Sequence, residues 1–251
     1  MPLNSEAGIM HFKVLSILFF LITSVLFTDV YGIFVKMPDD HFVLGERLVT
    51  NIVVSNPSDA YKAVEVGVSN RAYSLFRKER LVESDEFIII PAQFVLAPRQ
   101  DRTVTIKWAG SMSLKAEKPF RVVVEEVLFK EKKEQVVEKT SAKVRIRLKF
   151  VNSFYVRPKG VKPKIVATAL IPTENGRYYI DIKNEGSKHR IISKIDLGLG
   201  NAGNLGLIGV SPAMMNGAMN VLPGEVQRLV LSDLAQLPTK SYTIETFKMN
   251  P

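Results

Sequence analysis

The sequence predicts an all-β protein of two sandwich domains in tandem, and three observations carry this prediction. Short stretches rich in Val, Ile, Phe and Thr are interrupted about every 8–15 residues by Pro, Gly, Asn, Asp or Ser, a pattern typical of β-sandwiches. A chain of 251 residues is too long for one ordinary sandwich and suits two domains of about 100 residues each. Hydrophobic residues make up 46% and charged residues 24% of the chain, the balance of a folded globular protein.

Residues 1–32 have the features of a secretory signal peptide. Lys13 precedes the apolar run 14–27, and Gly32 provides a small residue at a cleavage point. An uncleaved membrane anchor is the alternative, but this run is shorter than the ~20 apolar residues that span a bilayer as a helix. We therefore expect an exported chain with no stable membrane insertion after signal cleavage.

The expected domain division follows the breaks in this pattern. Met10 serves as well as Met1 for the start, because the first nine residues add nothing that a signal peptide needs. We expect an N-terminal domain over 33–156 and a C-terminal domain over 157–251, joined by a linker at 155–160 that contains Pro and Gly.

Alternating apolar residues between turn signals mark the expected strands. In the N-terminal domain these are 48–55, 63–68, 87–90, 94–96, 103–108, 120–127 and 144–150. In the C-terminal domain they are 165–170, 178–182, 191–197 and 226–231. The charged segment 129–143 is expected to be a loop rather than a short helix, because it separates two strands that a hairpin would pair. The glycine-rich stretch 198–209 is expected to connect strands, because it lacks the Lys-Ser/Thr ending of a phosphate loop.

The charge distribution and the absence of Cys argue against several classes of function. Without residues 1–32 the chain has 33 basic and 23 acidic residues, and the bases are scattered among acids rather than gathered in a stripe. This distribution argues against a nucleic-acid partner. The absence of Cys excludes disulfides, thiol catalysis and Cys-ligated zinc.

Residues that carry chemistry are few. The histidines are His11, His41 and His189. They are far apart in the sequence, so they predict no metal site, and nothing indicates a cofactor. The acid pairs Asp39-Asp40 and Glu125-Glu126 are adjacent, which in a strand places the two carboxylates on opposite faces. No Gly-x-Ser-x-Gly or Ser-x-x-Lys motif is present, so we predict no catalytic residues and no enzyme.

The segment 144–150 is unusual because apolar and basic residues alternate through all seven positions. The apolar residues are Val144, Ile146, Leu148 and Phe150. One interpretation is an amphipathic strand with one buried and one solvated face, which periodicity alone favours. The other is an edge strand whose backbone pairs with a partner's open sheet and whose apolar row fills the partner's groove.

The sequence resembles the periplasmic pilus-assembly chaperones of the chaperone–usher systems. The residues that carry this resemblance are LVTNIVVSNPSD, IIIPAQFVLAPRQDRTVTI, KPFRVVVEEV, VRIRLKF, FYVRP and YYIDIKNEGSKHRIISKIDL, in this order over nearly all of 33–251. The resemblance implies two immunoglobulin-like domains, a periplasmic location, and a role in fimbrium biogenesis and cell wall organisation. It also implies donor-strand complementation of pilin or fimbrial subunits by the apolar row of 144–150, and delivery to an outer-membrane usher.

Two positions depart from the family pattern. The family carries an Arg early in the first strand and a Lys near the end of the donor strand, and together they hold the subunit's terminal carboxylate. Here Asp40 and Ser153 stand at those positions. An ionised Asp repels a carboxylate, so the resemblance implies an anchor built otherwise, from Lys36, Lys149 or Arg157, or none.

Two other functions remain open. An exported structural or adhesive sandwich protein with another client would need no spare edge strand. An exported hydrolase would need a reactive constellation that the sequence does not contain.

Overall fold

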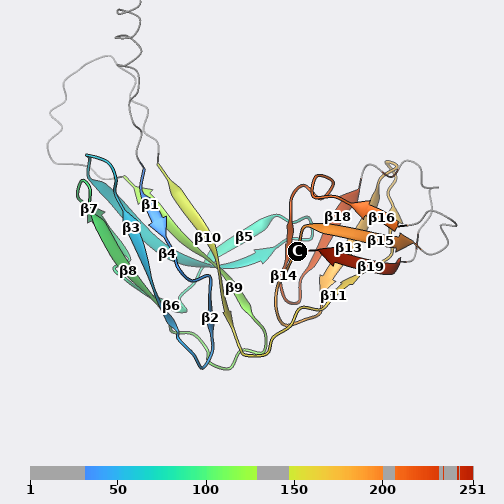
Figure 1. Cartoon of the computed structure of the whole chain (residues 1–251), viewed down its shortest axis with the longest axis horizontal. Coiled ribbons are helices and arrows are strands. Elements are labelled where there is room, and N and C mark those ends of the chain that lie inside the picture. The colour runs from blue at the N-terminus through green and yellow to red at the C-terminus, as the bar shows by residue number, and fades with distance from the viewer. Residues whose placement is uncertain are drawn as a thin grey trace, which may run out of the picture.

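The computed structural model describes residues 32–128, 147–199, 207–231, 234, 242 and 244–250, and all of its regular elements are strands. They form two lobes that meet at an angle (Figure 1). The prediction of an all-β chain with two sandwich domains is therefore confirmed. The expected signal peptide, except for Gly32, and the expected loop 129–143 lie outside the described residues. Within those residues, no helix is long and apolar enough to cross a membrane.

The N-terminal lobe contains two sheets. The first has the order β1-β3-β8-β6, with β1 (Phe34–Lys36), β3 (Val49–Ser55), β8 (Asp101–Trp108) and β6 (Phe87–Ile90). The second has the order β2-β10-β9-β4-β5, with β2 (His41–Val43), β10 (Lys149–Arg157), β9 (Lys118–Val127), β4 (Lys62–Tyr73) and β5 (Glu79–Glu83). Strand β7 (Gln93–Leu96) also pairs with β4.

Alternating burial along these strands produces the core between the two sheets. In β9 every second residue from Phe120 is buried, and in β3 the buried residues are Thr50, Ile52 and Val54. Because successive side chains of a strand point to opposite faces, this alternation gives each sheet one apolar face. Phe154 on β10 is fully buried in the same core.

The C-terminal lobe has a core of its own. One sheet contains β11 (Ile165–Ala167), β13 (Tyr178–Asn184), β12 (Ile171–Pro172) and β18 (Val226–Leu231). A second pairs β14 (Arg190–Ile192) with β17 (Met219–Val221). A third has the order β16-β15-β19, with β16 (Leu207–Val210), β15 (Lys194–Leu199) and β19 (Ile244–Asn250). The buried apolar residues of the described chain form two separate clusters, one for each lobe.

The structure corrects three of the expected elements. The predicted strand 191–197 is two strands in different sheets, because β14 ends at Ile192 and β15 begins at Lys194. The predicted linker begins too early, because Tyr155 and Val156 pair with both β2 and β9 inside β10. Residues 144–146 of the predicted strand 144–150 lie outside the described residues, and β10 begins at Lys149, so Arg147 and Leu148 precede it.

Candidate functional site

One flank of β10 is open along the first part of the strand. β9 pairs with residues 149–156 on one side, whereas β2 pairs on the other side only with residues 155–157. Within the described chain, no strand lies beside 149–154 on that second flank. The N-terminal domain therefore has a half-covered edge strand.

The hydrogen bonds show which backbone groups face the open flank. The Glu126 N–H donates to the Leu148 carbonyl at 3.0 Å toward β9, and the Tyr155 N–H donates to the Asp40 carbonyl at 3.0 Å toward β2. Because the direction alternates along an antiparallel strand, the N–H and C=O groups of Val151 and Ser153 point to the open flank. These groups are available to a further strand.

A hollow of about 370 Å³ lies beside this flank, between β10 and the segment that follows β1. It is lined by Val35, Met37, Pro38, Asp39, Asp40, Asn152 and Ser153. Thr50 donates its hydroxyl hydrogen to Asp39 at 2.6 Å, and Arg47 pairs with the same carboxylate. Asp40 lies 2.6 Å from His41, and mainly this hydrogen bond lowers the pKa of Asp40 below its ordinary value. The hollow therefore has an apolar wall and an acidic rim.

Two of the four residues predicted to fill a partner's groove are described, and both are half-buried. Phe150 packs against the core of the N-terminal domain, and Leu148 lies against Gly32. Their even positions place them on the same face of the strand as the buried Phe154. Val144 and Ile146 lie outside the described residues. The described part of the apolar row, Leu148 and Phe150, thus lies at the edge of the core of the N-terminal domain.

The outer face of the same sheet carries a group of charged side chains that the sequence analysis missed. Arg121 Nη1 and Arg71 Nη1 donate to the Ser153 hydroxyl oxygen at 2.7 and 3.1 Å. Glu79 lies between the two guanidinium groups, with Oε1 at 2.5 Å from Arg71 Nε and 2.8 Å from Arg121 Nη2. The Arg71 side chain is only 3% exposed. Two cations and one anion therefore meet at the end of the open flank.

The three bases predicted for an anchor are not brought together. Lys149 and Arg157 stand at the two ends of β10, about 27 Å apart along an extended strand. Lys149 pairs with Glu125 at 2.7 Å, and Lys36 is exposed on β1 in the other sheet. One carboxylate cannot reach all three, because their supports are separate.

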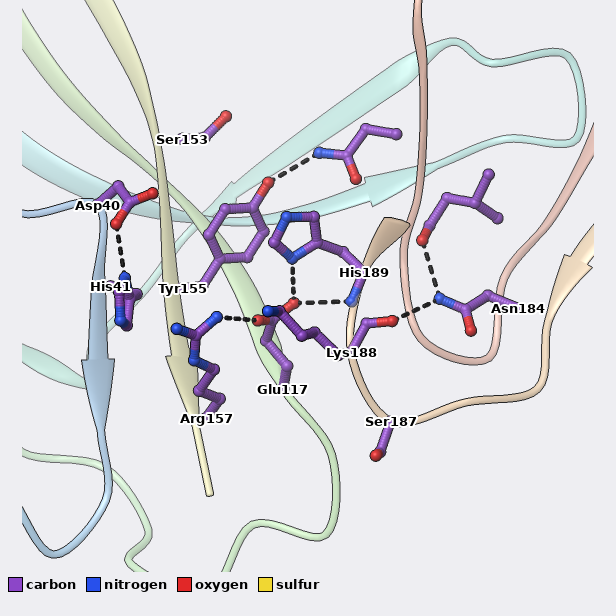
Figure 2. A network of polar contacts seen from close by, with 12 residues as sticks. Asp40, His41, Glu117, Ser153, Tyr155, Arg157, Asn184, Ser187, Lys188 and His189 are labelled. Atoms are coloured by element: carbon purple, nitrogen blue, oxygen red, sulfur yellow. Dashed lines mark hydrogen bonds and ion pairs between the residues drawn. The ribbon is translucent and has the colours of Figure 1, made fainter. Parts of the chain in front are cut away.

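The covered end of β10 faces the C-terminal domain (Figure 2). The ring of His189 stacks on Tyr155 at 4.0 Å, and the Asn220 side-chain amide donates to the Tyr155 hydroxyl at 2.7 Å. The side chain of Glu117 is fully buried, and its Oε1 accepts a hydrogen bond from the backbone N–H of His189 at 3.0 Å. The same oxygen lies 2.5 Å from Nδ1 of the His189 ring. Arg157 Nη1 lies 3.6 Å from the other oxygen of Glu117. This cluster fixes the C-terminal domain against the end of β10.

A second contact between the domains involves the turn between β4 and β5. The Tyr73 N–H donates to Glu225 Oε1 at 2.8 Å, and the Arg228 N–H donates to the Leu75 carbonyl at 2.6 Å. Burial raises the pKa of Glu225 above the ordinary carboxyl value, although the hydrogen bond from Tyr73 opposes this effect. The orientation of the domains thus depends on polar contacts at two separate places.

The described residues contain no group of three or more His, Cys, Asp or Glu side chains that could hold a metal ion. The features that remain are an unpaired strand flank, an adjacent hollow and an ionic cluster at the end of the flank. Such an arrangement is suited to binding an extended segment of another protein by strand addition.

The comparisons with known proteins agree with this class of site. Residues 45–162 match the N-terminal domain of PapD, described as a pili and flagellar-assembly chaperone. This match supports the resemblance to the PapD-like chaperones, and it lies in the N-terminal domain. No sequence match is found among curated proteins.

Solved structures support the two-domain immunoglobulin-like fold. The Acinetobacter baumannii complex of CsuC with the tip subunit CsuE, from archaic chaperone–usher Csu pili, contains a similar chain with TM-score 0.54 and 13% identity. That match covers 80% of this chain and 90% of the other. The E. coli chaperone DraB is similar with TM-score 0.53 and 12% identity, over 88% of this chain and 96% of DraB. At such low identity these likenesses concern the fold.

Proposed function

We propose that the protein binds pilus subunits by adding its own strand β10 to their incomplete sheet, and that it delivers them to an outer-membrane usher. The observation that carries the proposal is the open flank of β10 over residues 149–153. The match of residues 45–162 to the PapD N-terminal domain supports it, as does the similar fold of the CsuC chaperone in its complex with the tip subunit CsuE. The proposed location is the periplasm, where chaperones of this family work.

Strand addition supplies the binding energy in two ways. A subunit strand that runs beside β10 would pair with the outward N–H and C=O groups of Val151 and Ser153. The apolar row of Val144, Ile146, Leu148 and Phe150 would fill the subunit's groove. Each large aliphatic side chain that is buried contributes about 1.5–3 kcal/mol before the costs of ordering.

We propose further that the subunit's terminal carboxylate is anchored beside Ser153. The Ser153 hydroxyl already accepts from Arg71 and Arg121, so an anionic oxygen placed here would meet two guanidinium donors. Arg157 lies four residues, about 13 Å, further along the same face of the strand, and its guanidinium group faces Glu117. Lys36 and Lys149 are left for contacts at the rim.

The test is co-expression with an exported pilin-like subunit that lacks its own final strand, followed by purification of the complex. Val151→Pro removes an N–H that points to the open flank and none that pairs with β9, so we expect a folded protein that has lost the complex. Val151→Thr keeps the N–H and is the matched control, which should bind normally. Pairing through the backbone is refuted if Val151→Pro is folded and still binds.

The side-chain half of the proposal needs a second pair of variants. Leu148→Asp places a charge in the apolar row and should abolish the complex, whereas Val151→Asp on the opposite face should retain at least partial binding. Full binding by both variants, with pilin present, would favour an exported structural or adhesive sandwich protein with another client.

A further inference from the structure

The nitrogen of Ile33 is directed at a buried carboxylate. The Ile33 side chain is 3% exposed in the core of the N-terminal domain, and its N–H donates to Glu126 Oε1 at 2.9 Å. The Glu126 side chain is 6% exposed, and Lys62 Nζ donates to its other oxygen at 3.3 Å. One oxygen of the buried Glu126 carboxylate therefore accepts a hydrogen bond from an uncharged backbone amide.

The same nitrogen belongs to the bond at the end of the expected signal peptide. Val30-Tyr31-Gly32 provides the small residue that a leader peptidase needs before the cut. Hydrolysis adds water across the Gly32–Ile33 amide, so Gly32 leaves with a new carboxylate and Ile33 keeps the nitrogen as a free amine. Below about pH 8 that amine is mostly an ammonium ion.

We propose that leader removal after Gly32 converts the contact between Ile33 and Glu126 into a buried ion pair and uncovers Leu148 on the client-binding strand. Before cleavage the nitrogen is a neutral donor, and after cleavage it carries a full charge at the same position. The bond to the Glu126 anion is charge-assisted before cleavage, and the ammonium adds the attraction of a full opposite charge. Processing thereby locks the first residue of the mature chain to β9.

The charges around Glu126 are compatible with this pair. After cleavage each carboxylate oxygen has one cation, the Ile33 ammonium at Oε1 and the Lys62 ammonium at Oε2. A buried carboxylate is costly unless it is paired and hydrogen-bonded, and this arrangement meets both conditions. The departure of Gly32 also gives the other ammonium hydrogens access to water.

The second part of the proposal concerns Leu148 and rests on the proposed function. A Cβ atom added to Gly32 would lie 1.8 Å from Leu148 Cδ1, so the backbone of Gly32 covers that side chain. The Glu126 N–H holds the Leu148 carbonyl at 3.0 Å. Cleavage would remove the cover while the strand keeps its place, and the apolar row would be free for a pilus subunit.

The ion pair is tested by a double-mutant cycle that combines two first residues with two residues at position 126 and compares the unfolding constants of the four proteins. Chains that begin at Ile33 or at Gly32 are released from a fusion partner without extra residues, each with Glu126 or with Glu126→Gln. At pH 7 we expect the unfolding constant of the Ile33 chain to be about tenfold lower than that of the Gly32 chain, which equals about 1.4 kcal/mol. The difference should disappear at pH 10 and in Glu126→Gln.

Glu125→Gln is the matched control, because Glu125 is the neighbouring acid on the opposite face of β9 and should leave the difference unchanged. Equal stability of the two starts, or a difference that persists in Glu126→Gln, overturns the ion pair. Intact mass of the exported protein gives a third check, since any first residue other than Ile33 also overturns it.

The uncovering of Leu148 is measured without a pilus subunit. The chain has no Cys, so Leu148→Cys can be labelled selectively with a maleimide. We expect labelling to be several-fold faster in the chain that begins at Ile33 than in one that keeps Tyr31 and Gly32. Equal rates refute the uncovering and leave the proposed chaperone function to its own binding test.

Discussion

The two halves of β10 belong to one strand and share β9 as a neighbour, yet they differ in every other respect. Over residues 149–153 the second flank is open and the inward side chains are half-buried, with Val151 39% exposed on the outer face. From Phe154 to Val156 the side chains are buried, β2 covers the second flank, and His189 stacks on Tyr155. The covered half of β10 thus stabilises the protein, whereas the outward backbone groups of the other half face no strand within the described residues.

The largest expected effect on the free energy of unfolding concerns the inward-facing Phe side chains of the two halves of β10. Phe154 is fully buried and meets the ring of Phe42 edge-on at 4.8 Å. Phe154→Ala should therefore destabilise the fold by about 3–5 kcal/mol, measured by urea unfolding. Phe150→Ala in the open half should cost only about 1–2 kcal/mol, because its ring is partly exposed. Similar losses for both variants would erase the distinction.

A smaller effect is expected where the covered half meets the C-terminal domain. Glu117→Ala removes the acceptor of the His189 N–H and leaves that donor and Arg157 without their buried partner. We expect a loss of about 1–3 kcal/mol in the free energy of unfolding. Lys115→Ala, at an exposed residue shortly before β9, is a control for general disturbance of this segment. A loss below that of the control would show that the cluster does not stabilise the covered half.

A pH-dependent effect should appear at the other contact between the domains. Because burial raises the pKa of Glu225, the folded state opposes its ionisation. This penalty is absent below the ordinary carboxyl pKa and complete above the raised one. Glu225→Gln keeps an oxygen for the Tyr73 N–H but cannot ionise. The variant should therefore gain stability relative to the unmodified protein between pH 4 and pH 7, and a constant difference would contradict the assignment.

The smallest effect is expected at the exposed end of the open half. Lys149 pairs with Glu125 at 2.7 Å, but the two side chains are 54% and 36% exposed. Lys149→Ala should change the free energy of unfolding by no more than about 0.5 kcal/mol, because solvent screens such pairs. A larger loss in low salt would indicate that this end of the strand is less open than its exposure suggests.

The strands with strict alternation were predictable from the sequence. Residues of β3, β8, β9 and β18 alternate between buried positions and half-buried or exposed ones over six residues or more, and each strand was expected close to its observed bounds. The three-residue strands β1 and β2 were not expected, because so short a segment has no measurable period. They exist because longer strands offer them backbone partners.

The candidate site was only partly predictable for the same reason. Leu148 and Phe150 follow from alternation within one segment, and the structure places Phe150 near the start of β10 and Leu148 directly before it. Arg71 and Arg121 are 50 positions apart in the sequence, and nothing in their local surroundings indicates that they share the Ser153 hydroxyl. Only the alignment of β4, β9 and β10 in one sheet brings them together.

The sequence by itself determined the all-β class, the two-domain size and the apolar row, because each depends on composition or on periodicity along the chain. The tertiary structure alone decided which flank of β10 stays unpaired and which charges meet. Ile33 and Glu126 illustrate the reason, since 93 positions separate them and they meet through packing of distant segments. Short-range patterns fix what each strand is, whereas the pairing of distant strands fixes what each edge can bind.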